Sequence, residues 1–299
     1  MSMLYSISGI SKQAYHQYLA RQAAKEDRSS LYLQMVIQAR LMHPVIGLEK
    51  IYHLYKPEGI GRDAFIHIAT LAGYALEKPP MVSWKGSRVI PYQNLLSGKY
   101  FTDVNQIWVT DITYFKLGDS YYYISMIMDL YSRRIIACAL ADSLHASHSL
   151  ALLRKALKDR PLPRDHQLIH HSDKGVQYTS LAYTALLKKH RIGISMCNSV
   201  FENTAMERLN GIIKNDYLMH WYPKSYQQLK SLLKKAVRNY NLCPHGELKM
   251  NSPEEFEDRI KQIPLDKRKK MKVFTLKNKK GKDPNQLVLF DQKYLNLLT

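Results

Sequence analysis

The chain has 299 residues, which suits about two domains, and Lys plus Arg outnumber Asp plus Glu by 44 to 25, for a net charge of +19. Such a surface favours a nucleic-acid partner, because phosphate backbones bind it through counterion release. Three widely spaced cysteines argue against a disulfide framework or a Cys-rich zinc site, and we see neither a run of about 18 apolar residues nor a secretory signal, so we expect a cytosolic protein without a membrane partner.

Residues 1–79 are predicted to form a helical DNA-binding region. Ser11 can cap a first helix, and Ser30 can cap a second. Two shorter helices, over 47–55 and 62–72, are separated by a break that contains Pro57 and Gly59, and residue 79 ends the region.

A helix, a short Gly-containing turn and a second helix form the layout of a DNA-reading helix-turn-helix. We therefore take Arg62 and His67 as candidate DNA contacts in the second of the two short helices. A plain packing role is the alternative, since such helix pairs are common in helical domains.

Residues 80–104 carry Pro and Gly without periodicity, which predicts an extended linker. From Asn105 the chain becomes rich in β-branched and aromatic residues, as strands require. The order βββαβαβα over 105–225 predicts an α/β layer fold. The expected strands are 107–115, 121–129, 134–141, 167–171 and 192–196, and the expected helices are 146–158, 180–190 and 204–218.

Three carboxylates, Asp111, Asp173 and Glu207, lie within or at the ends of these elements, and strand ends in open α/β sheets are where ligands bind. Three oxygen donors suit two hard divalent cations that bind a phosphodiester and activate its attacker. Taken singly, each acid has a structural alternative: Asp111 as an edge group, Asp173 as a turn residue, and Glu207 as part of a capping box with Thr204 as the N-cap.

The residues around the acids resemble the catalytic core shared by retroviral integrases and bacterial insertion-sequence transposases, and in particular the transposases of the copy-out, paste-in family. The resemblance covers roughly residues 5 to 258. The segments that carry it are 105–114 (NQIWVTDITY), 128–136 (MDLYSRRII), 171–180 (HSDKGVQYTS), 203–207 with Lys214, Tyr240-Asn241, Pro244-His245 and 252–256 (SPEEF).

The resemblance implies an RNase H-like core with a mixed five-stranded sheet, in which Asp111, Asp173 and Glu207 hold two Mg²⁺, with Mn²⁺ able to substitute. The implied activity is nicking at the 3′ ends of an insertion sequence followed by strand transfer into DNA. The implied partners are double-stranded DNA, further copies of the chain in a dimer or larger assembly, and an upstream-frame fusion partner.

The chemistry agrees with this set of residues. Clustered carboxylates raise each other's pKa unless cations hold them ionised. With two Mg²⁺ roughly 4 Å apart, one ion activates water or a DNA 3′-hydroxyl while the other stabilises the leaving oxygen.

Two departures from the family pattern affect details. The interval from Asp173 to Glu207 is 34 positions (207 − 173), about two fewer than usual, and the difference falls in the loop 197–201. Glu202 stands where the family has Asp and is a rival third ligand, although the relation of Glu207 to Asn203 and Lys214 favours Glu207.

Further candidates for contact with DNA surround the acids. Lys214 lies two helical turns after Glu207 if the helix is regular, although a solvated lysine is the alternative. The other candidates are Lys174, Gln177, Tyr178 and Asn203.

Beyond the core, residues 226–260 are expected to be a helical extension and 261–299 a basic tail. Residues 261–282 hold ten basic side chains and one acid, Asp266, a net +9. We interpret this segment as a DNA-tracking arm, with solvated disorder as the alternative. For the whole chain, the alternative functions are an RNase H-like nuclease that only hydrolyses and an inactive DNA-binding regulator.

Overall fold

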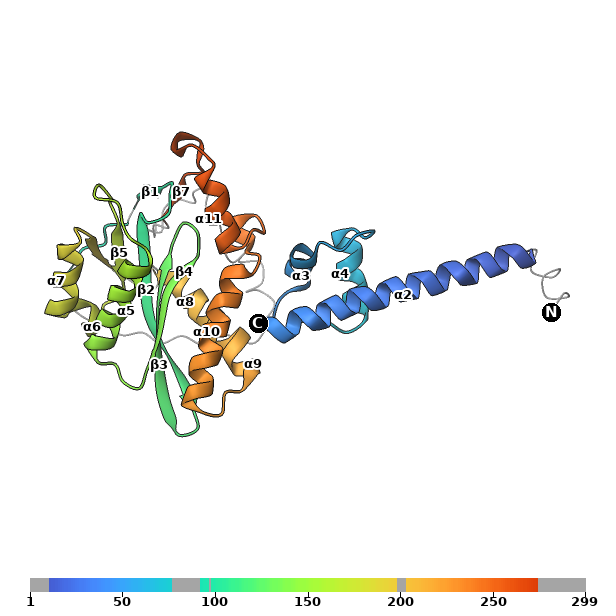
Figure 1. Ribbon diagram of the computed structural model, residues 1–299, viewed down its shortest axis with the longest axis horizontal. Helices are drawn as coiled ribbons and strands as arrows, with labels where there is room; N and C mark the ends of the chain where they lie inside the picture. The colour runs from blue at the N-terminus through green and yellow to red at the C-terminus, as the bar shows by residue number, and fades with distance from the viewer. Residues whose placement is uncertain (1–10, 77–91, 97, 198–202, 274–299) are drawn as a thin grey trace, which may run out of the picture.

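The computed structural model of the chain describes residues 11–76, 92–96, 98–197 and 203–273. A helical arm formed by the N-terminal part projects from an α/β body (Figure 1). In the described part of the chain, no helix combines the length and the apolar character needed to cross a bilayer. Glu202, most of the shortened loop before it and the tail from 274 onward lie outside the described residues.

The arm begins with α2, Lys12–Met42, whose N-cap Ser11 accepts a hydrogen bond from the Ala14 amide as predicted. The expected second helix starting at Ser30 was wrong, because α2 continues without interruption through that residue. Its 31 residues contain no Gly or Pro to break the backbone hydrogen bonds, so the potential cap at Ser30 is not used.

The two short helices are confirmed as α3, Leu48–Tyr55, and α4, Arg62–Leu71. The turn between them contains Lys56 and Gly59 at positive φ. Phe65, Ile51 and Val36 of the three helices are buried together in a small core of their own.

The body is built on a five-stranded mixed sheet with the order β4-β3-β2-β5-β6. The first three strands are antiparallel, whereas β5 and β6 run parallel to β2. The α/β fold class predicted from the sequence, a mixed five-stranded sheet with helices preceded by a helical region, is confirmed. The strands are β2, Ile107–Leu117; β3, Ser120–Asp129; β4, Ile135–Ala141; β5, Ile169–Ser172; and β6, Gly193–Met196.

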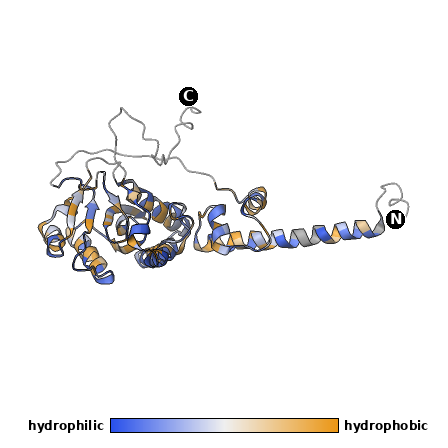
Figure 2. Ribbon diagram, turned by 90° about the horizontal axis from the view of Figure 1, so that it is seen from above, coloured by the Kyte–Doolittle hydropathy of each residue, from blue (hydrophilic) through white to orange (hydrophobic). Residues whose placement is uncertain are grey.

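Helices cover both faces of this sheet (Figure 1). Alternation along β2 divides its side chains: Trp108 faces a core that includes Leu153 of α5, while Val109 faces a core that includes Leu209 of α8. Figure 2 shows hydrophobic and hydrophilic residues interleaved along these elements, as two-sided packing requires. One layer is α5, Ala146–Asp159, with α6, Val176–Thr179, and α7, Leu181–Lys189; the other contains α8, Thr204–Gly211, and α10, Tyr226–Leu242.

The helix expected over 204–218 is not one regular α-helix. After α8 the chain continues as a π-helix, η2, Ile212–Leu218, and then α9, Met219–Trp221. The amide of Met219 donates to the carbonyl of Lys214, five residues back, which is the wider hydrogen-bonding pattern of a π-turn.

Three further helical elements follow α10 in the described part of the chain: η3, Gly246–Leu248; α11, Pro253–Lys261; and η4, Leu265–Lys267. Ser252 and Glu255 form a capping box at the start of α11. The short strand β1, Tyr100–Phe101, pairs antiparallel with β7, Met271–Lys272. The segments on either side of the core, expected to be a linker and a tail, are therefore joined at one point.

Candidate metal-dependent active site

Asp111 lies on β2 just beyond the part of that strand which pairs with β5. The parallel pairing covers only Ile107, Trp108 and Val109, so the edge of β2 is open beside Asp111. The Asn210 side-chain amide of α8 donates a 2.8 Å hydrogen bond to the Asp111 carboxylate. Asp111 keeps some solvent exposure although protein atoms surround it closely.

The pKa of Asp111 is raised to about 7. Burial is the largest cause, the negative charge of Asp173 adds to it, and that of Glu207 contributes less. Hydrogen bonds from the Ile112 backbone and the Asn210 side chain act in the opposite direction. The charges of Asp173 and Glu207 therefore both act on Asp111 at the open edge of β2.

Asp173 follows β5 directly and is exposed. Its Oδ1 accepts a 3.0 Å hydrogen bond from the Gly175 amide, and α6 begins at the next residue. The pKa of the buried Tyr178 is raised by burial and by the negative charges of Asp111 and Asp173. The two aspartates thus lie close to the same phenol ring.

Gly175 holds this turn tightly against the carboxylate. A Cβ atom at this position would lie 2.9 Å from Gln177 Oε1, 3.0 Å from Asp173 Oδ1 and 3.2 Å from Tyr178 Cδ2. The absence of a side chain at Gly175 therefore lets Asp173 keep its position.

Glu207 lies in the first turn of α8 and is exposed, and partial burial raises its pKa. The capping box weighed for it is not formed, because the N-cap residue is Asn203 rather than Thr204 and makes no side-chain cap bond. Asn203 is buried and instead donates from Nδ2 to the Thr110 carbonyl at 3.3 Å. This bond ties the start of α8 to the residue before Asp111.

The donor atoms fit a hard divalent cation. Within the ranges that the structure describes, no three His, Cys, Asp or Glu side chains already form a metal cage. The site nevertheless offers only oxygen ligands, and the buried Oδ1 atoms of Asn203 and Asn210 have no hydrogen-bond partner among the described residues. Repelling carboxylates with unpartnered amide oxygens beside them suit Mg²⁺, which prefers oxygen and retains water ligands.

Lys214 lies in the π-helix η2, and its ammonium group contacts an aromatic ring. Its Nζ lies 5.1 Å from the centre of the Tyr114 ring. The π-helix changes the spacing on which its predicted two-turn relation to Glu207 was based.

The other predicted DNA contacts fall into two groups. Gln177 and Tyr178 are buried, and Gln177 donates to the Leu144 carbonyl at 3.2 Å, which favours a part in shaping the Asp173 turn. Lys174 is half-buried beside Asp173. In the arm, His67 is exposed, whereas Arg62 pairs with Glu49 at 3.3 Å and joins α4 to α3.

Asn210 and Tyr114 lie at the site but were not predicted from the sequence. Asn210 follows Glu207 by three residues in the predicted helix, a spacing that places both on one face and was the available signal. Tyr114 is three residues after Asp111 in the same strand, but its contact with Lys214 depends on the π-helix and left no signal in the sequence.

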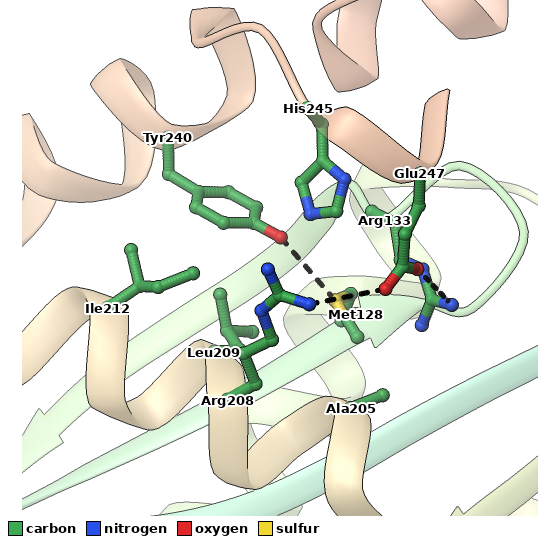
Figure 3. Close-up of a pocket in the computed structure, with 9 residues that line it drawn as sticks. All are labelled: Met128, Arg133, Ala205, Arg208, Leu209, Ile212, Tyr240, His245 and Glu247. Carbon is green, nitrogen blue, oxygen red and sulfur yellow. Dashed lines mark hydrogen bonds and ion pairs between the residues drawn. The ribbon is translucent and has the colours of Figure 1, made fainter. Parts of the chain in front are cut away.

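Charged residues that line a small cavity on another side of α8 anchor this helix (Figure 3). Glu247 accepts ion pairs from Arg133 at 2.6 Å and from Arg208 at 3.4 Å. Arg208 is the residue after Glu207, and Arg133 has a positive φ in the turn between β3 and β4. The three charges therefore fix α8 to the sheet without entering the site.

Known proteins are similar to the part of the chain that carries the sheet. Residues 102–199 match the family described as the integrase core domain, a segment that contains Asp111 and Asp173 and stops before Glu207. The transposase InsF for insertion sequence IS3A of Escherichia coli (strain K12) is 28% identical over 198 residues, 63% of this chain and 67% of the relative. A 31 kDa protein of insertion element IS600 of Shigella sonnei is 27% identical over 175 residues, 57% of this chain and 64% of the relative.

Among solved structures, the HTLV-2 integrase catalytic core domain in complex with magnesium matches with a TM-score of 0.42 and 20% identity, covering 55% of this chain and 99% of that one. The predicted resemblance to insertion-sequence transposases with a retroviral-integrase-type core is confirmed by the family match and the two relatives.

Proposed function

We propose that this chain, which carries an integrase core domain and is similar to insertion-sequence transposases, nicks DNA at the 3′ ends of an insertion sequence and joins those ends to other DNA. The observation that carries the proposal is the electrostatic coupling of Asp111 with Asp173 and Glu207 at the open edge of β2. Their mutual repulsion is what a pair of divalent cations would relieve.

In this proposal Asp111, Asp173 and Glu207 hold two Mg²⁺, with Mn²⁺ as a substitute. The bound ions would supply activation of the attacking water or 3′-hydroxyl and stabilisation of the leaving oxygen. Asn210 orients the Asp111 carboxylate through its 2.8 Å hydrogen bond, and Gly175 keeps the Asp173 turn close. Exposed Glu207 joins the two aspartates from α8.

Binding of double-stranded DNA rests on the net charge of +19 and on cations near the acids. In this proposal Lys214 and Lys174 would meet phosphates around the site, and Asn203, Gln177 and Tyr178 would support it. Arg62 and His67 would contact DNA from α4, as the second helix of a helix-turn-helix does. The similarity to transposases further suggests an assembly of several copies on paired DNA ends, and an upstream-frame fusion partner.

The test is strand joining on oligonucleotides that contain the element's ends, with Mg²⁺. We expect Asp111→Asn, Asp173→Asn and Glu207→Gln each to lower nicking and joining by about 10³-fold or more, since each removes a charged metal ligand. DNA affinity without metal should stay within about twofold. Asp159→Asn, an exposed carboxylate at the end of α5, is the matched control and should retain full activity.

Unchanged rates in Asp111→Asn and Asp173→Asn would refute the assignment of the site. Products that are cut but never joined would identify a nuclease of the same fold. Salt-sensitive DNA binding without any Mg²⁺-dependent turnover would identify a DNA-binding regulator.

A further inference from the structure

The hairpin formed by β2 and β3 has two different faces beyond Asp111. Phe115 pairs with Tyr122, and the Tyr122 ring packs 5.2 Å from Tyr226 of α10, so this face is covered. Because side chains alternate along a strand, the neighbouring positions point to the opposite face. That face carries Tyr114, Lys116, Tyr121 and Tyr123, with Tyr114 opposite Tyr123 and Lys116 opposite Tyr121.

Two tyrosines on this opposite face are open to solvent. Tyr114 is 57% exposed and Tyr121 is 49% exposed. Their rings meet edge to face, with centroids 5.7 Å apart. Lys214 lies over the Tyr114 ring, and Lys116 lies over the Tyr121 ring at 6.0 Å. We call Tyr114, Tyr121, Lys116 and Lys214 the tyrosine–lysine face.

Stabilisation of the hairpin alone does not account for this composition. Cross-strand aromatic pairs contribute about 0.2–1 kcal/mol each, and they do so when their rings are covered as well as when they are open. Here half of each ring is left in water, and both flanking charges are positive. Apart from Asp111, the acids of the hairpin are Asp119 in the turn and Asp129, which is fully buried at the other end.

The tyrosine–lysine face lies near Asp111 along the strand but on the opposite side of β2. Tyr114 follows Asp111 by three residues, about 10 Å along an extended strand, so alternation directs the two side chains to opposite faces. Lys214 reaches Tyr114 from η2, four residues after Asn210, whose side chain binds Asp111. The same strand and the same helical segment therefore supply both the carboxylate site and the aromatic surface.

We propose that the tyrosine–lysine face binds unpaired nucleotides next to the reacting phosphate. Bases would stack on Tyr114 and Tyr121, while Lys116 and Lys214 leave the rings for the phosphates. Aromatic rings interleaved with cations are the means by which proteins bind single-stranded nucleic acid without reading its sequence. This proposal rests on the proposed function and deepens it, because it implies that DNA is unpaired beside the site.

Charge complementarity selects this occupant over a protein partner. A protein docking on two half-exposed rings would have to bury or pair two lysine ammonium groups, whereas a polynucleotide offers a base for each ring and a phosphate for each cation.

The test uses the full-length protein in EDTA, so that no chemistry takes place. One probe is a DNA duplex with a three-nucleotide single-stranded overhang that contains 2-aminopurine, and the other is the matching blunt duplex. We expect wild-type protein to quench the 2-aminopurine fluorescence, as stacking on a ring does. Tyr114→Leu and Tyr121→Leu should each weaken overhang binding by about tenfold, since stacking on an aromatic ring contributes about 1–3 kcal/mol per base.

Tyr114→Phe and Tyr121→Phe should keep both the quenching and the affinity, because the ring remains. Tyr100→Leu is the matched control: Tyr100 is 62% exposed and has Lys272 5.7 Å over its ring, but it lies on β1, before the start of β2. It should bind both probes as wild type does.

The proposal is overturned if the Leu variants bind the overhang as tightly as wild type, or if they lose equal affinity for the blunt duplex. It is also overturned if Tyr114→Leu changes the sedimentation of the free protein, which would make the face a contact between copies of the chain. If the protein quenches the fluorescence but does not join strands, the binding proposal stands and the proposed function is refuted. If it joins strands without quenching, the proposed function stands and the binding proposal is refuted.

Discussion

Gly175 is the residue on which the geometry of Asp173 most directly depends. The carboxylate accepts from the Gly175 amide, and the space a methyl group would need is already occupied by Asp173, Gln177 and Tyr178. The backbone of Gly175 has a negative φ, so an alanine would meet a steric obstacle without backbone strain.

We therefore expect Gly175→Ala to lower the rate of nicking by about tenfold or more, because a displacement of about 1 Å in a reacting group can cost 10²-fold. The expected change in the free energy of unfolding is small. Single-turnover nicking with saturating Mg²⁺ measures the first quantity and urea denaturation the second. Gly118→Ala is unsuitable as a control because Gly118 has a positive φ; Gly211→Ala, with open space around the new methyl group, is the matched variant. Equal rates for Gly175→Ala and Gly211→Ala would contradict the role given to the turn.

At the scale of elements, α11 is held to the sheet by a buried carboxylate. Glu257 accepts from Arg160 at 2.6 Å, from Arg134 at 2.9 Å and from Ser132 at 2.6 Å. These hydrogen bonds lower its pKa although burial raises it. Arg160 also pairs with fully buried Asp129 at 3.6 Å, so the same guanidinium joins α11 to the end of β3.

Glu257→Ala should destabilise the protein by about 3 kcal/mol, because it removes a buried carboxylate and leaves two partly buried guanidinium groups without that partner. Chemical denaturation at pH 7.5 is the measurement. Asp258→Ala changes the adjacent, exposed carboxylate and should leave the free energy of unfolding almost unchanged. If the two variants were equally stable, the buried cluster would not be holding α11.

The arm contacts the body through a buried histidine–tyrosine pair. His43, at the end of α2, lies with Nδ1 2.7 Å from the Tyr217 hydroxyl of η2. Burial, assisted by the positive charge of Lys50, lowers the pKa of His43 to about 4. The ring is therefore neutral in the folded protein at pH 7.

A histidine whose pKa is lower in the folded than in the unfolded chain contributes stability above pH 6.5, and that stability is lost as the pH falls towards 4. Between pH 7.5 and 5, His43 should account for a loss of about 2 kcal/mol in the free energy of unfolding, because pH 5 lies 1.5 units below the unfolded pKa of about 6.5. Urea denaturation at both pH values should show a smaller loss for His43→Gln than for wild type. His67→Gln, at an exposed position of α4, should behave as wild type. An identical pH dependence for His43→Gln and wild type would contradict the contact.

The elements that one local pattern decides could be predicted from the sequence. β2 and β3 were visible from their β-branched and aromatic residues. The three carboxylates were selected for their positions within or near element ends, and their role stays a prediction. Prediction failed where distant or subtle geometry decides. Ser30 is a good cap in a segment that never breaks, the π-turn of η2 has no distinct composition, and the pairing of Tyr100 with Lys272 joins residues far apart in the chain.

At the scale of the whole molecule, the net charge of +19 should dominate DNA affinity. For six or more phosphate contacts, we expect affinity for a duplex to fall by about 10³-fold or more between 50 and 200 mM salt. Fluorescence anisotropy over a salt series gives the slope directly. Lys214→Gln should reduce that slope by about one unit if its ammonium meets a phosphate. A slope unchanged by this substitution would assign Lys214 to the Tyr114 ring alone.

The wide turn of η2 also has a geometric consequence. Each residue of an α-helix advances the chain by about 100° of rotation. Deleting one residue within 212–218 would let ordinary helical bonding run through and would turn Tyr217 around the helix axis relative to Glu207. Because His43 of the arm contacts Tyr217, such a deletion would shift this anchor point of the arm relative to the acids.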